Sequence, residues 1–543
     1  MEKRTTDVLI IGGGLAAVMA ALEASEISAS VLMVSKGKVG KSGATLMAGS
    51  NFAAVMPEGE AKGDSRNLHI EDTLSGGAHI NDLELVRTMV ENGPRDLLFL
   101  EKLGVHFLKR DGRFELRKPP GHRFPRTMFT VNPGVPLRIR GKTIMDPLLQ
   151  VVRQKGIQCL DGFSVLRLIV RDGSVAGALA IETRSGDLLL VQCKAAILAS
   201  GGAGAIYEIH TNPNDLTGDS YSLALEAGCS LRDVEFVQFF PSVHLGTPRV
   251  TLYSPLLGDG AVLRNKDGER FLEKYEPERM ESATRDTVSR AIYREIQEGR
   301  SIDGGVYLDL SSIPAELLDF RFPDLLQLFQ KHGINLKKDW IRVAPAAHFF
   351  MGGVAINARC QTSIPGLFAA GEATGGVHGA NRLSGNGLTD PLVFGRIAGK
   401  EAGLYARGNA VSPLSGEGFS TESLFKGRRV SAEEITDGRR RIKKIMWEKV
   451  GMIRTRVGLT QALEAFEALQ AWIDAGCPSK EIAGDYFELR SMLIAARAMA
   501  GAALFREESR GAHFRDDFPE SRQEWAKSLF IRLEGAELKP FFP

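Results

Sequence analysis

Short apolar runs punctuate the first half of the chain. Residues 8–11, 31–34 and 196–199 are runs of consecutive apolar side chains, which are typical of parallel strands covered on both faces. Between these runs the apolar positions recur at helical spacing, so the pattern predicts strands that alternate with helices. This alternation indicates an α/β protein built on a largely parallel sheet.

The pattern changes further along the chain. Residues 1 to about 240 keep the strand–helix alternation, residues 241–347 are mixed and richer in charge, and residues 348–420 return to glycine-rich turns. From about residue 430 the apolar positions follow a helical period nearly to the end. The basic run 438–444 is expected to be a solvated face of one of these helices.

Composition limits the classes of function. The 543 residues exceed what one hydrophobic core usually serves, so two or three domains are expected. A net charge of +2 gives no argument for binding nucleic acid or an anionic membrane surface. No two of the five cysteines lie within four residues of each other, so we expect no metal site and no iron–sulfur cluster in this chain.

The N-terminus and the apolar stretches bear on location. The chain enters a predicted strand by Asp7, which leaves no room for a signal peptide. The uncharged stretch at residues 8–22 is too short to span a bilayer. We therefore expect a cytoplasmic protein without membrane insertion.

Glycines between the first two predicted strands form a dinucleotide-binding motif. The first strand runs directly into Gly12-Gly13-Gly14-Leu15-Ala16-Ala17, and a helix and the second strand follow. Gly12 permits a tight turn, Gly14 lets the backbone approach a pyrophosphate, and Ala17 allows the helix to lie close to the strand. The N-terminus of the helix offers free N–H groups and a partial positive charge to phosphates.

The later turns distinguish FAD from NAD. The acidic residue that usually ends the second strand of an NAD site is missing, and Ser35-Lys36 stands there instead. A small-residue loop at 40–45 and strands that run into glycines at 197–202 and 367–372 provide three more candidate contacts. Each signal alone is more often an ordinary tight turn. Together they predict FAD, a cofactor long enough to contact several separate segments.

Ordered motifs continue through the rest of the chain. They are EFVQF at 235–239, GERF at 268–271, RDTVSR at 285–290, PAAHFFMGG at 345–353, HGANRL at 378–383, and ESRGAH at 508–513 followed by DFP at 517–519. These motifs resemble the flavoprotein subunit family of fumarate reductase, succinate dehydrogenase and L-aspartate oxidase. The resemblance covers essentially the whole chain, and the length and C-terminal pattern are most similar to L-aspartate oxidase. It implies an FAD-binding domain at 1–240 and 348–420, a capping domain at 241–347 and a C-terminal helical domain at 430–543.

The glycine motif and the resemblance together give the candidate cofactor residues. By position, Asp219 and Glu372 are expected to contact the flavin nucleotide, and Gly387 and Leu388 to approach the ring system through their backbone. The succinate dehydrogenase type attaches FAD through a histidine just before a threonine in the second loop. Ala44 stands there in this chain, so the FAD is expected to be non-covalent. The full set is Gly12, Gly13, Gly14, Leu15, Ala16, Ser35, Lys36, Ser42, Thr45, Gly49, Val165, Ala199, Gly201, Asp219, Gly371, Glu372, Arg382, Gly387 and Leu388.

The resemblance also implies the location of the substrate. Family members hold a dicarboxylate between the flavin and the capping domain, and an arginine moves the proton while hydride passes to or from flavin N5. By motif, Arg285 takes the proton-transfer position, and His348 and Arg382 are carboxylate ligands. An arginine can bind a carboxylate through two parallel hydrogen bonds, but it is a poor acid unless its surroundings lower its pKa.

Several positions of this site depart from the family. Phe240 stands where the family has a substrate-binding histidine, and Tyr253-Ser254-Pro255-Leu256-Leu257 replaces a Thr-Glu pair followed by an arginine. In a looser alignment, Pro119 replaces the glutamate that binds the substrate amine in L-aspartate oxidase. A carboxylate buried against Phe240 without a polar partner is strongly disfavoured, so we expect an apolar end and a substrate that is not a simple C4 dicarboxylate. Tyr253 offers a phenol for proton transfer or stacking, and His244 fits equally a displaced polar contact or a loop histidine.

Three functions remain open. The first is an FAD oxidoreductase acting on a C–C or C–N bond beside a carboxylate or carbonyl of a small organic substrate, with Arg285 or Tyr253 handling the proton. The second is L-aspartate oxidase or fumarate reductase with a rebuilt site. The third is an electron-transfer subunit of a larger complex; adenylylsulfate reductase is a related case with a different pocket. An iron–sulfur protein is the partner expected for such a complex, and a homo-oligomer is equally compatible with the sequence.

Overall fold

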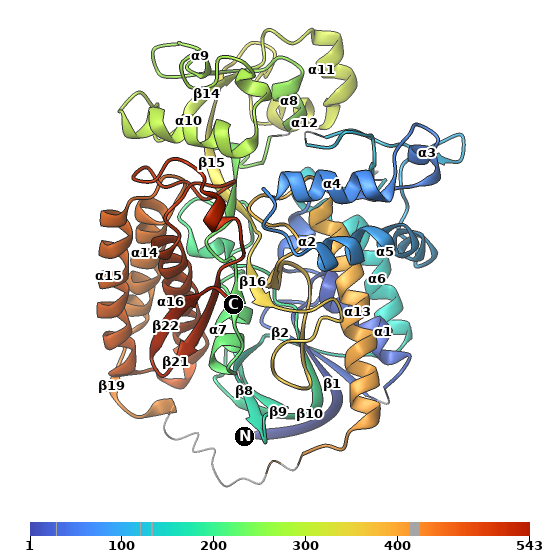
Figure 1. Ribbon diagram of the computed structural model, residues 1–543, viewed down its shortest axis with the longest axis vertical. Helices are drawn as coiled ribbons and strands as arrows, with labels where there is room; N and C mark the ends of the chain where they lie inside the picture. The colour runs from blue at the N-terminus through green and yellow to red at the C-terminus, as the bar shows by residue number, and fades with distance from the viewer. Residues whose placement is uncertain (29, 120, 132–133, 253, 413, 415–423) are drawn as a thin grey trace.

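The computed structural model describes residues 1–28, 30–119, 121–131, 134–252, 254–412, 414 and 424–543. Tyr253, a candidate catalytic residue, therefore lies outside the described residues. Figure 1 shows three regions: a sheet with its covering helices, a separate layer of helices and strands at one end, and a group of C-terminal helices along one side. The α/β fold with a capping unit and a C-terminal helical unit follows the prediction.

The largest sheet contains the predicted apolar strands. Its order within the described residues is β7-β2-β1-β10-β9-β8, and β17 also pairs with β10. The strands β7, β2, β1, β10 and β17 run parallel, and β9 and β8 are antiparallel additions. Their bounds are β1 Glu2–Ile11, β2 Val31–Ser35, β7 Gln158–Asp161, β8 Phe163–Arg171, β9 Ser174–Glu182, β10 Leu188–Leu198 and β17 Leu367–Ala369.

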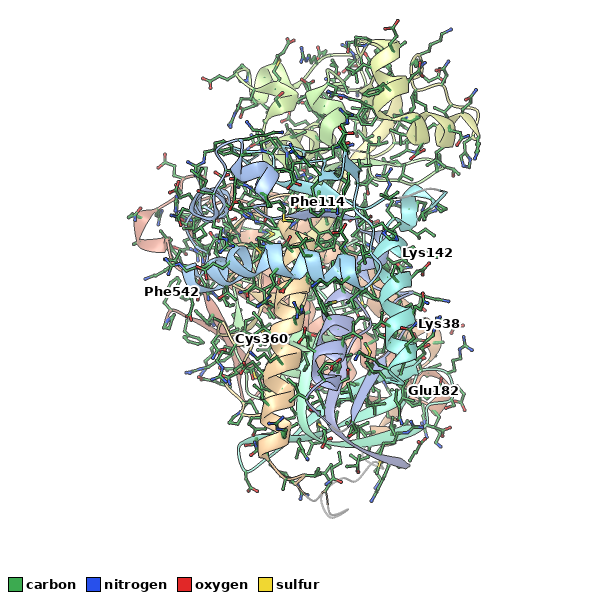
Figure 2. All side chains as sticks on the ribbon, turned by 90° about the vertical axis from the view of Figure 1, so that its right-hand side faces the viewer. Lys38, Phe114, Lys142, Glu182, Cys360 and Phe542 are labelled. Atoms are coloured by element: carbon green, nitrogen blue, oxygen red, sulfur yellow. The ribbon has the colours of Figure 1, made fainter. Side chains whose placement is uncertain are left out.

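Two helices far apart in the sequence lie against each other on this sheet. Helix α1 (Leu15–Ser25) is buried on nearly every side, and α13 (Asn386–Gly408) lies beside it, with α6 (Lys142–Gln154) next in the layer (Figure 2). Glycines on α13 make the close approach possible: a Cβ at Gly395 would lie 2.6 Å from the carbonyl oxygen of Ala16, and a Cβ at Gly399 would overlap that of Ala20. Helix α5 (Leu83–Lys102) also packs on α13.

The capping unit has a hydrophobic cluster of its own. A sheet of order β12-β15-β14-β13 connects it to the rest of the chain, because β12 and β15 are long enough to reach from the large sheet region into the cap. Residues between 250 and 343 form the cluster, packed under α10 (Arg285–Gln297), α11 (Ala315–Arg321) and α12 (Pro323–Gln330). The strands are β12 Val237–His244, β13 Val262–Arg264, β14 Val306–Asp309 and β15 Ile341–Phe350.

The C-terminal part is mainly helical and ends in two strands. Helices α14 (Ala432–Lys449), α15 (Arg456–Asp474) and α16 (Ala483–Phe505) stand side by side (Figure 1). A capping box between Ser431 and Glu434 starts α14. The chain then returns as the hairpin β21 (Phe530–Glu534) and β22 (Glu537–Phe541), which extends a sheet formed by β11 (Leu231–Arg232), β16 (Gly353–Ala355) and β18 (Thr374–Gly375).

The described residues contain neither a helix suited to cross a membrane nor a cluster of metal-ligating side chains. Among the described helices, none combines the length and the apolar character that a membrane crossing requires. Within the same residues, no group of three or more His, Cys, Asp or Glu side chains is arranged to hold a metal ion.

Candidate active site

The glycine turn after β1 forms a cradle at the start of α1. Gly12 has a φ of +134°, which L side chains rarely adopt, and a Cβ there would overlap the carbonyl of Ala199. Gly14 is the N-cap of α1, and the helix has no side-chain cap and no acid in its first turn. The N–H of Leu15 donates to Thr45 Oγ1 at 3.1 Å, which places the second loop beside the first. This arrangement leaves backbone N–H groups for an anion and fits the diphosphate of FAD.

A lysine occupies the position after β2 where an acid was expected. Lys36 Nζ contacts Asp219 Oδ2 at 2.8 Å and Glu488 Oε2 at 2.7 Å, and the three side chains are 13–17% exposed. Burial alone lowers the pKa of Lys36, but the two carboxylates outweigh it and raise the pKa. Asp219 thus comes from the first residue of α7 (Asp219–Glu226) rather than from the end of β2. It brings a carboxylate to this end of the cavity from another segment, and Glu488 of α16 connects the C-terminal helices to the same place.

Glu372 lies in the cavity wall behind the strands β15 and β17. The backbone N–H of Phe350 donates to Glu372 Oε1 at 3.1 Å. Loss of hydration raises the pKa of Glu372 to about 8, although the Phe350 hydrogen bond and the charge of Arg382 act in the opposite direction. At neutral pH the carboxyl is therefore mostly protonated and can donate a hydrogen bond to a ligand.

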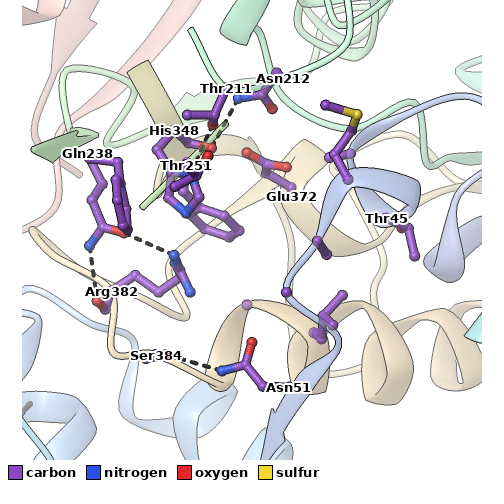
Figure 3. Close-up of a pocket in the computed structure, with 18 of the residues that line it drawn as sticks. Thr45, Asn51, Thr211, Asn212, Gln238, Thr251, His348, Glu372, Arg382 and Ser384 are labelled. Atoms are coloured by element: carbon purple, nitrogen blue, oxygen red, sulfur yellow. Dashed lines mark hydrogen bonds between the residues drawn. The ribbon is translucent and has the colours of Figure 1, made fainter. Parts of the chain in front are cut away.

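The candidate cofactor residues converge on one cavity of about 2770 Å³, part of which is drawn in Figure 3. Its walls include every candidate cofactor residue except Gly371. Gly371 instead has a φ of +73°, and a Cβ there would lie 2.9 Å from Ala16 Cβ and 3.1 Å from Pro391 Cβ. Its role in the structure is therefore a close turn beside α1 and α13.

Two arginines share one amide acceptor on the substrate side of the cavity. Gln238 Oε1 accepts from Arg382 Nη2 at 2.9 Å (Figure 3). It also accepts from Arg285 Nη1 at 3.5 Å. Gln238 Nε2 donates to Asn381 Oδ1 at 2.6 Å and to the carbonyl of Arg382 at 3.0 Å, so the amide is held in one orientation. Loss of hydration lowers the pKa of Arg285 to about 10. It also lowers the pKa of Arg382 to about 9, and the charge of Arg285 acts in the same direction.

His348 faces the same cavity from β15. Its Nδ1 lies 2.8 Å from Thr211 Oγ1. Loss of hydration and then the charges of Arg382 and Arg285 hold the pKa of His348 well below its ordinary value, so the ring is neutral. If Thr211 donates to Nδ1, the ring proton stands on Nε2, where it can be donated to a carboxylate.

Phe240 lies between the two groups that were predicted to bind the substrate. Its ring centroid is 5.2 Å from that of His348 and 4.9 Å from the guanidinium carbon of Arg285. Behind it, Val243, Ala346 and Ile209 form a small apolar cluster. The family's histidine position is thus an aromatic wall in this chain.

The segment that replaces the Thr-Glu and Arg positions belongs mainly to the capping core. Leu256 and Leu257 are buried in its hydrophobic cluster, and Leu257 also lines the cavity. Ser254 begins the short helix α8 (Ser254–Gly258). Pro119 lines the cavity as well. Leu257 and Pro119 therefore give this part of the cavity wall two apolar side chains.

His244 does not line the cavity. Its Nδ1–H donates to the carbonyl of Pro248 at 2.7 Å, and its ring contacts that of Phe329 in a tilted arrangement, with the centroids 4.9 Å apart. Desolvation lowers its pKa. Of the two interpretations of this residue, the structure supports the histidine satisfied inside the capping unit.

Two residues of this site were not predicted from the sequence. Gln238 lies in the motif at 235–239, but the motif does not indicate that its side chain contacts two arginines. Thr211 lies in an irregular loop with no motif. In both cases the missing information is which distant side chain each residue meets.

Comparisons with known proteins agree with this geometry. The model of the FAD binding domain matches residues 7–388, and the model of the fumarate reductase flavoprotein C-terminus matches residues 439–540. An FAD-dependent oxidoreductase of Methanocaldococcus jannaschii, described as uncharacterized, is 40% identical over 97% of this chain and 96% of its own length. The CoM/CoB fumarate reductase of Methanothermobacter marburgensis has a subunit that is 39% identical over 97% of this chain and 96% of its own length. The solved structure of Mycobacterium smegmatis Sdh1 in complex with UQ1 superposes with a TM-score of 0.88 at 32% identity, over 100% of this chain and 94% of that one.

Proposed function

The chain is an FAD-dependent oxidoreductase of the fumarate reductase, succinate dehydrogenase and L-aspartate oxidase flavoprotein family, and on that basis we propose that it acts on an organic acid other than a simple C4 dicarboxylate. The bond that changes is a C–C or C–N bond beside a carboxylate or carbonyl group. The observation that carries this proposal is Phe240, which lies between His348 and Arg285 and replaces a polar carboxylate ligand with an aromatic ring.

Arg382 and His348 provide the remaining anchor for one acidic group. The Arg382 guanidinium is held by Gln238 on one side, and its Nε is buried with no hydrogen-bond partner among the described residues. An unpartnered N–H in this position favours a carboxylate ligand. The neutral imidazole of His348 adds a second donor.

Arg285 is suited to move the proton. Its pKa of about 10 makes the guanidinium a better acid than an arginine in water. FAD, when bound, supplies or accepts the hydride at N5. In the reducing direction the carboxylate bound by Arg382 polarises the adjacent double bond, and Arg285 donates a proton to the carbon that does not receive the hydride. Tyr253 is the alternative proton carrier.

Reduction of matched acids tests this proposal. Oxidation of reduced methyl viologen by the holoenzyme is measured with trans-2-hexenoate and with fumarate at equal concentrations. We expect turnover with the monocarboxylate to exceed turnover with fumarate, and Arg382→Gln to abolish both. Faster turnover of fumarate would contradict the proposal.

Fumarate reduction is the second candidate. It is favoured by Arg285, Arg382 and His348, which keep their family positions in one cavity, and by the 39% identity to one chain of a fumarate reductase. L-aspartate oxidation is the related alternative, and release of hydrogen peroxide on addition of L-aspartate tests it. The fumarate reductase relative is one subunit of a complex, which also supports an iron–sulfur partner that exchanges electrons with the flavin.

The cofactor is proposed to be non-covalent. Ala44 opens the short helix α2 (Ala44–Met47), lines the cavity and carries no group that could bond to the flavin. Acid precipitation of the protein is expected to release all FAD into the supernatant. Yellow colour retained in the pellet would contradict this.

A further inference from the structure

A short extended segment of the capping unit presents a cation to the substrate side of the cavity. Residues 250–252 pair with the end of β12: Thr251 bridges Val243, the N–H of His244 donates to Val250, and that of Leu252 to Ser242. Side chains alternate along such a segment. Leu252 is buried in the capping cluster, whereas Arg249 and Thr251 both line the cavity.

A second cation reaches the cavity from the C-terminal helices. Lys443 of α14 is half-buried and lines the cavity. Its neighbours Arg439, Arg440 and Lys444 have acidic partners on the same helix or on α16. In the described part of the chain, neither Lys443 nor Arg249 forms an ion pair. The solvated-face prediction for 438–444 therefore does not hold for Lys443.

Both cations lie within electrostatic range of His210, whose backbone pairs with Ala347 of β15, next to the substrate anchor His348. The pKa of His210 is lowered to about 4. Burial is the largest cause, followed by the charge of Lys443 and, more weakly, by the charge of Arg249. The next residue, Thr211, bonds His348. The charge of Glu488 also acts on Lys443, but Glu488 is already paired with Lys36 and Arg439. The positive charges beside the cavity therefore leave a positive potential that favours an anion. Glu208 also lines the cavity, is exposed, and pairs with neither cation in these residues.

An apolar wall separates these cations from the inner anchor. Phe240 and Val243 line the cavity, and Ile209 packs behind them. Along β12 the wall leads from Gln238, which holds Arg382, past Phe240 to Val243, which pairs with Thr251 two residues after Arg249. Lys443 lines the same cavity from α14. This order of polar, apolar and polar surfaces matches an elongated molecule with charge at both ends.

We propose that Arg249 and Lys443 form an outer anion subsite, and that the substrate is an acid with a second anionic group several carbons beyond the first. The inference rests on the proposed function, in which Arg382 and His348 bind one carboxylate. In this chain Phe240 stands where a C4 site has its second carboxylate ligand. We place the second anion-binding group at Arg249 and Lys443 instead, farther from the inner anchor. The outer group is a carboxylate or another small oxyanion at the end of an apolar chain.

Two acids of equal length test the subsite. The holoenzyme is titrated with trans-2-octenedioate and with trans-2-octenoate at physiological ionic strength, and binding is followed by the change in flavin absorbance. We expect the dioate to bind at least about ten-fold more tightly than the monoacid. Arg249→Gln with Lys443→Gln is expected to remove this difference, because the dioate loses more affinity than the monoacid. Arg441→Gln, an exposed arginine on the same helix that does not line the cavity, is the matched control and is expected to change neither.

The outcomes separate the two proposals. Equal binding of the two acids by the unmodified enzyme, or a dioate advantage that survives in the double variant, overturns the outer subsite alone. If Arg382→Gln leaves the binding of both acids intact, or if neither acid perturbs the flavin, the inner anchor is wrong and both proposals fall. Flavin content measured for every variant distinguishes lost binding from a misfolded protein.

Discussion

Glu372 gives the protein a stability that depends on pH. The folded chain holds this carboxyl with a pKa of about 8, against an ordinary value of 4.5. The group therefore stays protonated in the folded state over a range where the unfolded chain ionises it. Its contribution to stability is fully present below about pH 4.5 and is lost as the pH rises through about 8, and above that pH the loss is complete.

The magnitude follows from the two pKa values. An interval from 4.5 to about 8 corresponds to at most about 5 kcal/mol. The side chain lines a cavity and keeps some solvent contact, which reduces the effect, so we expect roughly 2–4 kcal/mol. In a protein of this size that difference shifts the melting temperature by roughly 1–2 °C per kcal/mol.

Glu372→Gln isolates this contribution, because glutamine keeps the shape and the acceptor for Phe350 but does not ionise. Thermal unfolding of the flavin-free protein is measured between pH 5 and pH 9 for both forms. We expect similar melting temperatures at pH 5 and a variant that is more stable by roughly 3–6 °C at pH 9. Glu467→Gln, at an exposed position of α15, serves as the control. A melting difference that does not change with pH would refute the reasoning.

Three other substitutions test the cavity. Arg285→Gln is expected to lower turnover by roughly 10²–10⁴-fold while the protein keeps its bound yellow FAD; loss of FAD instead would show that Arg285 holds the cofactor. Lys36→Met leaves Asp219 without its cation, at a cost of about 3 kcal/mol, so FAD should dissociate measurably faster on dilution, whereas Lys38→Met at an exposed position should not change the rate. Phe240→His restores a donor at the inner wall and is expected to tighten fumarate binding by about ten-fold, as judged by flavin absorbance; unchanged binding would mean that Phe240 does not set the length of the substrate.

The strands and the cofactor cradle were predictable because their signals are local. Four-residue apolar runs identify buried parallel strands, and the glycines at 12–14 need a tight turn wherever the chain folds. The hairpin β21–β22 was not predicted, since β21 pairs with β11, about 300 residues earlier in the sequence. The apolar positions of the neighbouring helices set the helical period from which this region was predicted.

The candidate site was predictable only where motifs named its residues. The resemblance identified Arg285, His348 and Arg382 as candidates, and in the structure all three line one cavity. Pairings between distant residues were not accessible: Lys36 meets Glu488 across 452 positions, and the sequence gives no sign of it. The loss of polar groups at Phe240 was visible, whereas the cations beyond it became apparent only when Arg249 and Lys443 were placed along the same cavity.

The packing of α1 against α13 has a consequence for how the protein is made. An emerging polypeptide completes β1 and α1 within its first 25 residues, yet the glycine face that covers this apolar helix is translated only after residue 386. Until then the ribosome holds a chain whose first helix has no partner for one of its sides, and a chaperone or provisional contacts must shield it. Glu488, which closes the other end of the cradle through Lys36, is synthesised later still. Stable binding of FAD is therefore expected only when translation is nearly complete. Fragments that end before α13 are expected not to bind FAD.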